Sequence, residues 1–235
     1  MKQKLAACLL FAACLWAFSA SAADESANIP ANVSANPPAD LGRIIQETQQ
    51  QRARPDHFRM VWWMPSHFWA AVLHNVPVDP QEALALLDTH TIVAVIDAKL
   101  PSSGAPVFTP RRELAESLVL QVDRQGEWLA PLEEEVQTDG VRIFLATLRE
   151  YLARQFGRLG GGFEFFLFPN RNLHNEIILS PRHNQWLSIR LQDETFLWRL
   201  PPASFFPDRQ DAETGETFPG NYRFNPYTGK ALASP

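Results

Sequence analysis

Residues 186–200 have the sequence WLSIRLQDETFLWRL, in which two segments rich in aromatic and branched side chains flank the polar triplet Gln192-Asp193-Glu194. Apolar segments of this length on either side of a short polar turn are typical of a β-hairpin. A second hairpin is predicted nearer the N-terminus. There Val119, Gln121 and Asp123 alternate with the apolar Leu120 and Val122, and the chain turns at Arg124-Gln125-Gly126 to return through Trp128. The two hairpins predict antiparallel pairing of strands.

Further strands are predicted from short apolar runs. Phe58 to Met64 ends at a proline, and Thr91 to Ile96 is rich in β-branched side chains. Phe163 to Phe168 is apolar at almost every position, so we expect it to be buried on at least one face. Another strand is predicted at Ile177 to Leu179, and the loop between residues 101 and 110 is expected to contain none.

The predicted helices share apolar positions three or four residues apart, or a capping residue at the start. One helix has the clearest start signal, with Asp79 as N-cap, Pro80 at the first position and Glu82 at the third. The longest is expected to end at Gly157 and the glycines of residues 160–162. The helices cover residues 41–52, a segment that begins at Ser66 and contains Phe68 and Trp69, residues 79–87, residues 113–118 and residues 139–156.

Helices and strands mixed without a regular βαβ order predict an α+β fold. We expect a mainly antiparallel sheet packed with about three to four helices in a single domain at residues 41–202. Residues 23–40, rich in Pro, Ala, Asn and Ser, are predicted to be a flexible linker. Residues 203–235 are predicted to form a ribbon-like tail packed on the domain.

The N-terminus has the pattern of a secretory signal peptide at residues 1–22. Lys2 and Lys4 precede the apolar run Leu5 to Phe18, and Ala20-Ser21-Ala22 supplies a cleavage site after Ala22. We therefore expect a periplasmic or secreted protein. Both cysteines, Cys8 and Cys14, lie in the segment removed, so the mature chain is predicted to be cysteine-free.

Lipoprotein anchoring is a minor alternative, because Cys8 and Cys14 each follow small residues. Cleavage before Cys14 would leave Leu15, Trp16 and Phe18 at the new N-terminus, which disfavours it. A transmembrane segment is not expected, since the apolar run has 14 residues and a spanning helix needs about 20. The formal charge of −5 argues against nucleic-acid binding, which requires a broad basic field.

The sequence lacks the common catalytic signatures. A cysteine-free mature chain excludes thiol catalysis, and no Gly-x-Ser-x-Gly nucleophile motif is present. His174 and Glu176 alternate, and with another acid they would suit a hydrolase acting on an envelope polymer. We treat that hydrolase as an alternative and expect the protein not to be an enzyme.

Tryptophans suggest a binding surface instead. Trp62 and Trp63 are adjacent in a predicted strand and must face opposite sides, so at least one faces the core. An exposed ring would mark a binding patch for a sugar or a peptide. The candidate binding residues are Trp63, Trp186 and Trp198.

The tail contains two similar phrases, DAETGE at residues 211–216 and NPYTGK at residues 225–230. In each, an Asp or Asn side chain can accept backbone hydrogen bonds and a glycine closes the turn, which predicts two tight turns. Their spacing resembles the paired knuckles of a zinc ribbon, with non-sulfur side chains in place of the four cysteines. A metal-free ribbon is therefore predicted. The residues at those four positions are Asp211, Thr214, Asn225 and Thr228.

A calcium site is the alternative for the tail, because calcium prefers oxygen ligands. The EF-hand spacing is missing, and we expect no cofactor. Phe218, Tyr222, Phe224 and Tyr227 are predicted to fasten the tail to the domain. The candidate calcium ligands are Asp208, Asp211, Glu213 and Glu216.

The strand Val61-Trp62-Trp63-Met64-Pro65, the Phe68-Trp69 helix and the tail from Gly215 to Gly229 together resemble uncharacterised exported bacterial proteins. The resemblance implies an exported globular domain and no particular site. The function we predict is non-catalytic binding in the cell envelope, with an envelope protein or a glycan as partner. A role as a structural or assembly partner in the envelope is a further alternative.

Overall fold

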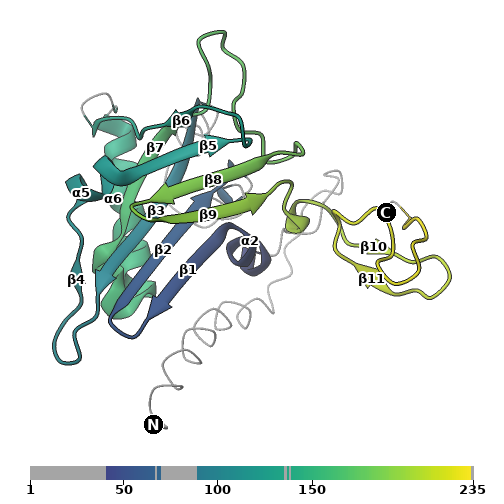
Figure 1. Cartoon of the computed structure of the whole chain (residues 1–235), viewed down its shortest axis with the longest axis horizontal. Coiled ribbons are helices and arrows are strands. Elements are labelled where there is room, and N and C mark those ends of the chain that lie inside the picture. Colours follow the sequence, from purple (N-terminus) through teal and green to yellow (C-terminus); the bar gives the residue numbers. More distant parts are fainter. Residues whose placement is uncertain (1–40, 67, 70–88, 135–136, 138, 234–235) are drawn as a thin grey trace, which may run out of the picture. The chain divides into compact units, whose positions relative to one another are not determined.

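The computed structural model describes residues 41–233 except 67, 70–88, 135–136 and 138 (Figure 1). The described residues belong to one compact unit, Ala39–Pro235. They form an α+β fold with antiparallel sheets, which confirms the predicted class. Among them, no helix combines the length and the apolar character needed to cross a bilayer.

Five strands form the larger sheet, with β3 at its centre. One edge of β3 pairs with β2, which in turn pairs with β1. The other edge is shared, because β7 pairs with residues 90–95 of β3 and β4 pairs with Ala98 and Lys99. The strands are β1 (Gln49–Arg54), β2 (His57–Met64), β3 (His90–Lys99), β4 (Val107–Phe108) and β7 (Glu164–Pro169).

The smaller sheet has four strands in the order β6-β5-β8-β9, all antiparallel. Both predicted hairpins are confirmed within it, since β5 pairs with β6 and β8 pairs with β9. The β8–β9 connection is a two-residue turn in which Leu191 faces Glu194. The strands are β5 (Leu118–Val122), β6 (Trp128–Leu129), β8 (Trp186–Leu191) and β9 (Glu194–Arg199).

The helices and the tail complete the described structure. The helices are α2 (Leu41–Thr48), α5 (Arg111–Ser117), α6 (Asp139–Gln155) and the 3₁₀ segments η4 (Gly157–Gly162) and η5 (Ala203–Phe205). In the tail, β10 (Arg209–Gln210) pairs with β11 (Thr217–Phe218).

The two faces of the larger sheet contribute to two separate apolar cores, because alternate side chains of each strand point to opposite faces. On β2, Met60, Trp62 and Met64 pack in one core with α6 side chains such as Phe144. Val61 and Trp63 point the other way, into a second core shared with the smaller sheet. Successive side chains of a strand alternate between faces, so an unbroken apolar run is what a strand buried on both sides requires. Helices α2 and α6, the larger sheet and the smaller sheet thus form three layers, and α5 contributes Leu114 to the core between the sheets (Figure 1).

The helix predicted over residues 41–52 is wrong beyond Thr48. Gln49 to Arg54 forms β1 instead, with Gln49 paired to Trp62 and Arg54 paired to His57. The strand β2 offers hydrogen-bonding partners along this whole edge, and tertiary pairing of this kind overrides a weak local helix preference. The helix predicted over residues 79–87, and most of the one that begins at Ser66, lie outside the described residues.

Two other segments differ from prediction. The loop over residues 101–110 contains the short strand β4. Ile177 to Leu179 is not a strand and makes only an isolated bridge between Ile177 and Arg171. The backbone N–H groups of Ile178 and Leu179 donate to the carbonyl and the side chain of Asn170, which removes them from any ladder.

Candidate binding surface

The three tryptophans predicted to bind a ligand occupy different environments. Trp63 and Trp198 are 2% and 4% exposed and lie in the core between the two sheets. Their assignment as surface binding residues is therefore corrected, because strand parity turns both rings inward. Trp186 has the opposite parity on β8 and lies on the outer face of the smaller sheet, half-buried.

The outer face of the smaller sheet carries mostly polar and aromatic side chains. Its inner face supplies Leu118, Leu120, Leu187, Ile189 and Phe196 to the core, so the intervening residues point outward. The strand register places Trp128 opposite Gln121, and Gln121 opposite Ser188. Trp186 lies opposite Arg199, and Arg190 lies opposite Thr195.

Three arginines on this face lie over two tryptophan rings. The guanidinium carbons of Arg124 and Arg199 are 4.9 and 4.8 Å from the centre of the Trp186 ring. The guanidinium carbon of Arg190 is 4.5 Å from the centre of the Trp128 ring. Cation–π contacts of this kind contribute about 0.5–1 kcal/mol each at exposed sites and restrict the arginine side chains. We call these five residues the Arg–Trp surface.

The turn after β5 holds Arg124 in place. Asp123 has φ 57° and donates its N–H to the carbonyl of Trp186 at 2.7 Å, while its carboxylate accepts the Trp186 N–H at 3.0 Å. Aspartate tolerates this left-handed conformation better than most residues. A Cβ on Gly126 would lie 2.0 Å from the carbonyl oxygen of Val122, so only glycine fits there. The turn therefore fixes Arg124 beside the start of β8.

The three guanidinium groups of the Arg–Trp surface have no anionic partner among the residues that the structure describes. Their side chains are exposed, and neither an ion pair nor a hydrogen bond joins them to another described side chain. The acidic residues nearest to Arg190 and Arg199 in sequence, Asp193 and Glu194, form ion pairs with Arg59 and Arg54 instead. A cationic patch thus exists on a chain whose formal charge is −5.

A buried polar cluster fixes the opposite end of the β8–β9 hairpin. Arg59 on β2 donates from Nε to Asp97 on β3 at 2.8 Å. Its terminal nitrogens donate to the side chains of Gln192 at 2.6 Å and Asp193 at 3.1 Å, both in the β8–β9 turn. One arginine therefore connects the two sheets, and Gln192 keeps a strained φ of 53° at that turn.

Asp97 is ionised at the centre of this cluster. Burial acts to raise the pKa of its carboxyl, but hydrogen bonds from Thr109 and Arg59 and the charge of Arg59 outweigh it and lower the pKa. Thr109 Oγ1 donates to one carboxylate oxygen at 2.6 Å, and His57 Nε2 lies 2.8 Å from the other. Burial also opposes the charge of Arg59, whose pKa is nevertheless raised by its bond to Asp97. The pair lies within the larger sheet, is largely closed to solvent, and orients Arg59 toward the turn of the smaller sheet.

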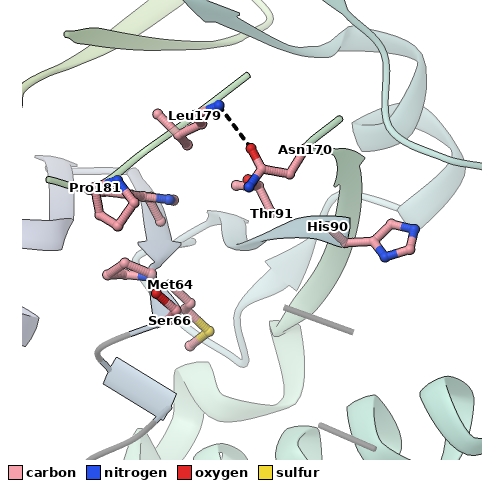
Figure 2. A pocket seen from close by; sticks show the side chains of 9 residues that line it. Met64, Ser66, His90, Thr91, Asn170, Leu179 and Pro181 are labelled. Carbon is pink, nitrogen blue, oxygen red and sulfur yellow. Dashed lines mark hydrogen bonds between the residues drawn. The ribbon is translucent and has the colours of Figure 1, made fainter. Parts of the chain in front are cut away.

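A small cavity lies where β2 ends and β3 begins, beside the 170–181 loop (Figure 2). Its volume is about 30 Å³, room for one or two water molecules. Trp63, Met64, Thr91 and Asn170 contribute to its lining, and Asn170 accepts the N–H of Leu179 at 2.9 Å. The cavity is too small for a sugar or a peptide side chain.

The tail contains both predicted turns, and a hydrogen bond joins them. The carboxylate of Asp211 accepts the N–H groups of Glu213 and Thr214, and the Asn225 side chain accepts those of Tyr227 and Thr228. The Asn225 amide then donates to Asp211 at 2.7 Å and joins the two turns. Hydrogen bonds to Asn225, Thr214 and Glu213 lower the pKa of Asp211 to about 2.

Three of the four candidate calcium ligands of the tail, Asp208, Asp211 and Glu213, have separate partners, and the exposed Glu216 does not join them in a cluster. Asp208 forms an ion pair with Arg43 at 3.0 Å, and Glu213 pairs with Lys230 at 2.6 Å. Asp211 is engaged by backbone N–H groups and Asn225. Within the described part of the chain, no three His, Cys, Asp or Glu side chains are arranged to hold a metal ion.

Two other predicted groups are placed by the structure. His174 and Glu176 lie in an exposed turn, where Asn172 donates to Glu176 and accepts the backbone N–H of His174. Phe218 is buried in the tail, but Phe224 and Tyr227 are 59% and 80% exposed. Phe224 and Tyr227 therefore do not fasten the tail, which corrects that prediction.

Comparisons with family models, with curated proteins and with solved structures found no match to this chain. Sequence reasoning found Trp186 and missed Arg124, Arg190 and Arg199. Alternation within the predicted β8–β9 hairpin could have placed Arg190 and Arg199 on the face of Trp186, whereas Arg124 lies in a turn and had no such signal.

Proposed function

We propose that this chain is an exported protein that acts by non-catalytic binding in the cell envelope, and that it binds through the Arg–Trp surface. One observation carries the proposal: three exposed guanidinium groups are held over two tryptophan rings and have no described counterion. Unpaired cations ordered in this way lose little conformational entropy on binding, which favours affinity for a partner.

The alternatives receive less support. A hydrolase would need His174 and Glu176 to converge with a further acid, and these residues sit in a turn with local partners. An assembly role has one supporting observation, the exposed rings of Phe224 and Tyr227 in the tail. The same binding experiment can compare both surfaces.

The experiment is co-sedimentation of the mature chain, starting at Ala23, with an envelope fraction at low salt. We expect the R124Q/R190Q/R199Q variant to lose most of the binding. A matched control, R112Q/R142Q/R154Q, removes three exposed helical arginines that have carboxylate partners in the same helix and should bind as the parent does. Loss of binding in an F224S/Y227S variant instead would favour the assembly role and contradict our proposal.

A further inference from the structure

The chemistry presented by the Arg–Trp surface is cationic rather than aromatic. Guanidinium groups lie over the rings of Trp128 and Trp186, two of them over Trp186. A neutral sugar would have to displace them in order to stack on those rings. A guanidinium that uses its flat face for a ring still offers N–H donors in its plane, and these match the two oxygens of a carboxylate or phosphate.

The spacing of the cations suits a polymeric ligand with repeated anionic groups better than a single small anion. Trp128 and Trp186 are separated by two strand spacings and two residues along a strand, since Trp128 faces Gln121, Gln121 faces Ser188, and Ser188 is two residues from Trp186. Strand spacings of about 4.8 Å and rises of about 3.3 Å place the two positions about 12 Å apart. A ligand with repeated anionic groups can occupy both positions, whereas a monomeric anion reaches one.

The surroundings favour a polysaccharide over an acidic protein segment. Side chains of β1 contact the outer edge of β9. The Gln50 side chain donates to the Leu197 carbonyl at 2.7 Å, and Arg54 pairs with Glu194 at 2.6 Å. An extended peptide that added there as a strand would have to displace these contacts. Leu197 is 43% exposed, but its neighbours on this face, Thr195, Arg199 and the facing Ser188, are polar, so β9 offers a protein partner no contiguous apolar patch to bury.

We infer that the Arg–Trp surface binds an anionic polysaccharide, with its carboxylate or phosphate groups on Arg190 at one end and on Arg124 and Arg199 at the other. This inference rests on the proposed binding function and specifies its ligand class. The backbone of the polysaccharide lies across β5 and β8, and its repeated charges supply the counterions that the described chain lacks.

Titration of the mature chain with three probes tests the inference, with tryptophan fluorescence as the readout. Polygalacturonate supplies a carboxylated polysaccharide, its fully methyl-esterified form is the neutral control, and poly-L-glutamate supplies the same charge on a peptide backbone. We expect polygalacturonate to bind, with an affinity that falls as salt rises. The esterified polymer and monomeric galacturonate should bind about tenfold more weakly or not at all.

Variants assign the binding to the surface. R124Q/R190Q/R199Q should lose about tenfold or more in affinity for polygalacturonate, and R112Q/R142Q/R154Q should lose none. Equal or tighter binding of poly-L-glutamate would overturn the inference in favour of an acidic protein partner, and equal binding of the esterified polymer would overturn the role of charge. If no probe binds while co-sedimentation still depends on the three arginines, the ligand class is wrong and the proposed function stands. If co-sedimentation is also independent of them, both fail.

Discussion

Arg59 shows how one residue can join two layers. It is 3% exposed on β2, donates to Asp97 on the neighbouring strand, and reaches Gln192 and Asp193 in the turn of the smaller sheet. A buried charge of this kind is stable only while its partners remain, because removing one partner leaves the other charged and desolvated.

Asp97→Asn should therefore lower the free energy of unfolding by about 3–5 kcal/mol, because it leaves the Arg59 guanidinium without its buried counterion. Chemical denaturation measures the loss. Asp193→Asn is the matched control, since Asp193 binds the same guanidinium but its side chain is 77% exposed. That variant should lower the free energy of unfolding far less, because an ion pair exposed to solvent contributes little to stability. Similar losses in the two variants would show that burial of the pair is not the cause.

Asp211 makes the stability of the tail depend on pH in the acidic range. The hydrogen bonds from Asn225, Thr214 and Glu213 lower its folded-state pKa to about 2, below the ordinary value of 3.8. A group with a lowered folded pKa contributes stability that is present above its ordinary pKa and is lost as the pH falls through the folded value. We expect the turns at residues 211–216 and 225–230 to weaken between about pH 4 and pH 2.

NMR titration of the backbone amide signals of Glu213 and Thr214 and of the side-chain amide signals of Asn225 measures that dependence. In Asp211→Asn the same signals should change much less over this pH range, because the titrating group is gone. A parent chain whose tail signals stay constant down to pH 2 would contradict the assigned role of the ionised carboxylate.

At the scale of elements, the buried apolar strands were predicted from sequence and the polar strand β1 was not. Apolar runs identified β2, β3, β7, β8 and β9, because strands buried on both faces show little else. β1 was missed because its sequence QQQRAR has no strand pattern, and it is a strand only through pairing with β2. The two strands form a hairpin joined by Pro55 and Asp56, but a polar strand that pairs on one edge only lacks the apolar pattern by which the other strands were found.

For the glycines after α6, the sequence likewise predicted the end of the helix but not what each glycine contacts. They were predicted to end the helix, but the structure shows that their individual roles differ. A Cβ on Gly160 would lie 2.0 Å from the carbonyl oxygen of Ala153, which is backbone and cannot rotate away. A Cβ on Gly161 would meet only the Phe108 ring, at 3.8 Å.

Gly160→Ala should thus lower the free energy of unfolding by about 1–3 kcal/mol, since the junction of α6 and η4 must open to admit a methyl group. Gly161→Ala should stay within about 0.5 kcal/mol of the parent. Urea denaturation of both variants under the same conditions makes the comparison. Equal stability of the two variants would mean that the close approach at Gly160 relaxes freely.

At the scale of the whole molecule, the candidate site arises from strand parity. The sequence indicated that tryptophans matter but could not tell which face each ring occupies, since that depends on the register of β5, β6, β8 and β9. Trp63 and Trp198 went to the core and Trp186 to the surface. The arginines became a cationic patch only when three strands and a turn brought them to two rings.

A binding role in the envelope also requires export, and the N-terminal pattern predicts how the mature chain begins. Cleavage after Ala22 removes Lys2, Lys4 and both cysteines, so the protein isolated from an envelope fraction should have an intact mass that starts at Ala23 and should contain no thiol. Mass spectrometry before and after treatment with a thiol reagent tests both statements. A mass with a diacylglyceryl group on Cys14 would replace a released protein by an anchored one, and the Arg–Trp surface would then act on polymers within reach of the membrane. An uncleaved chain would contradict export, and the choice of an envelope ligand would lose its basis.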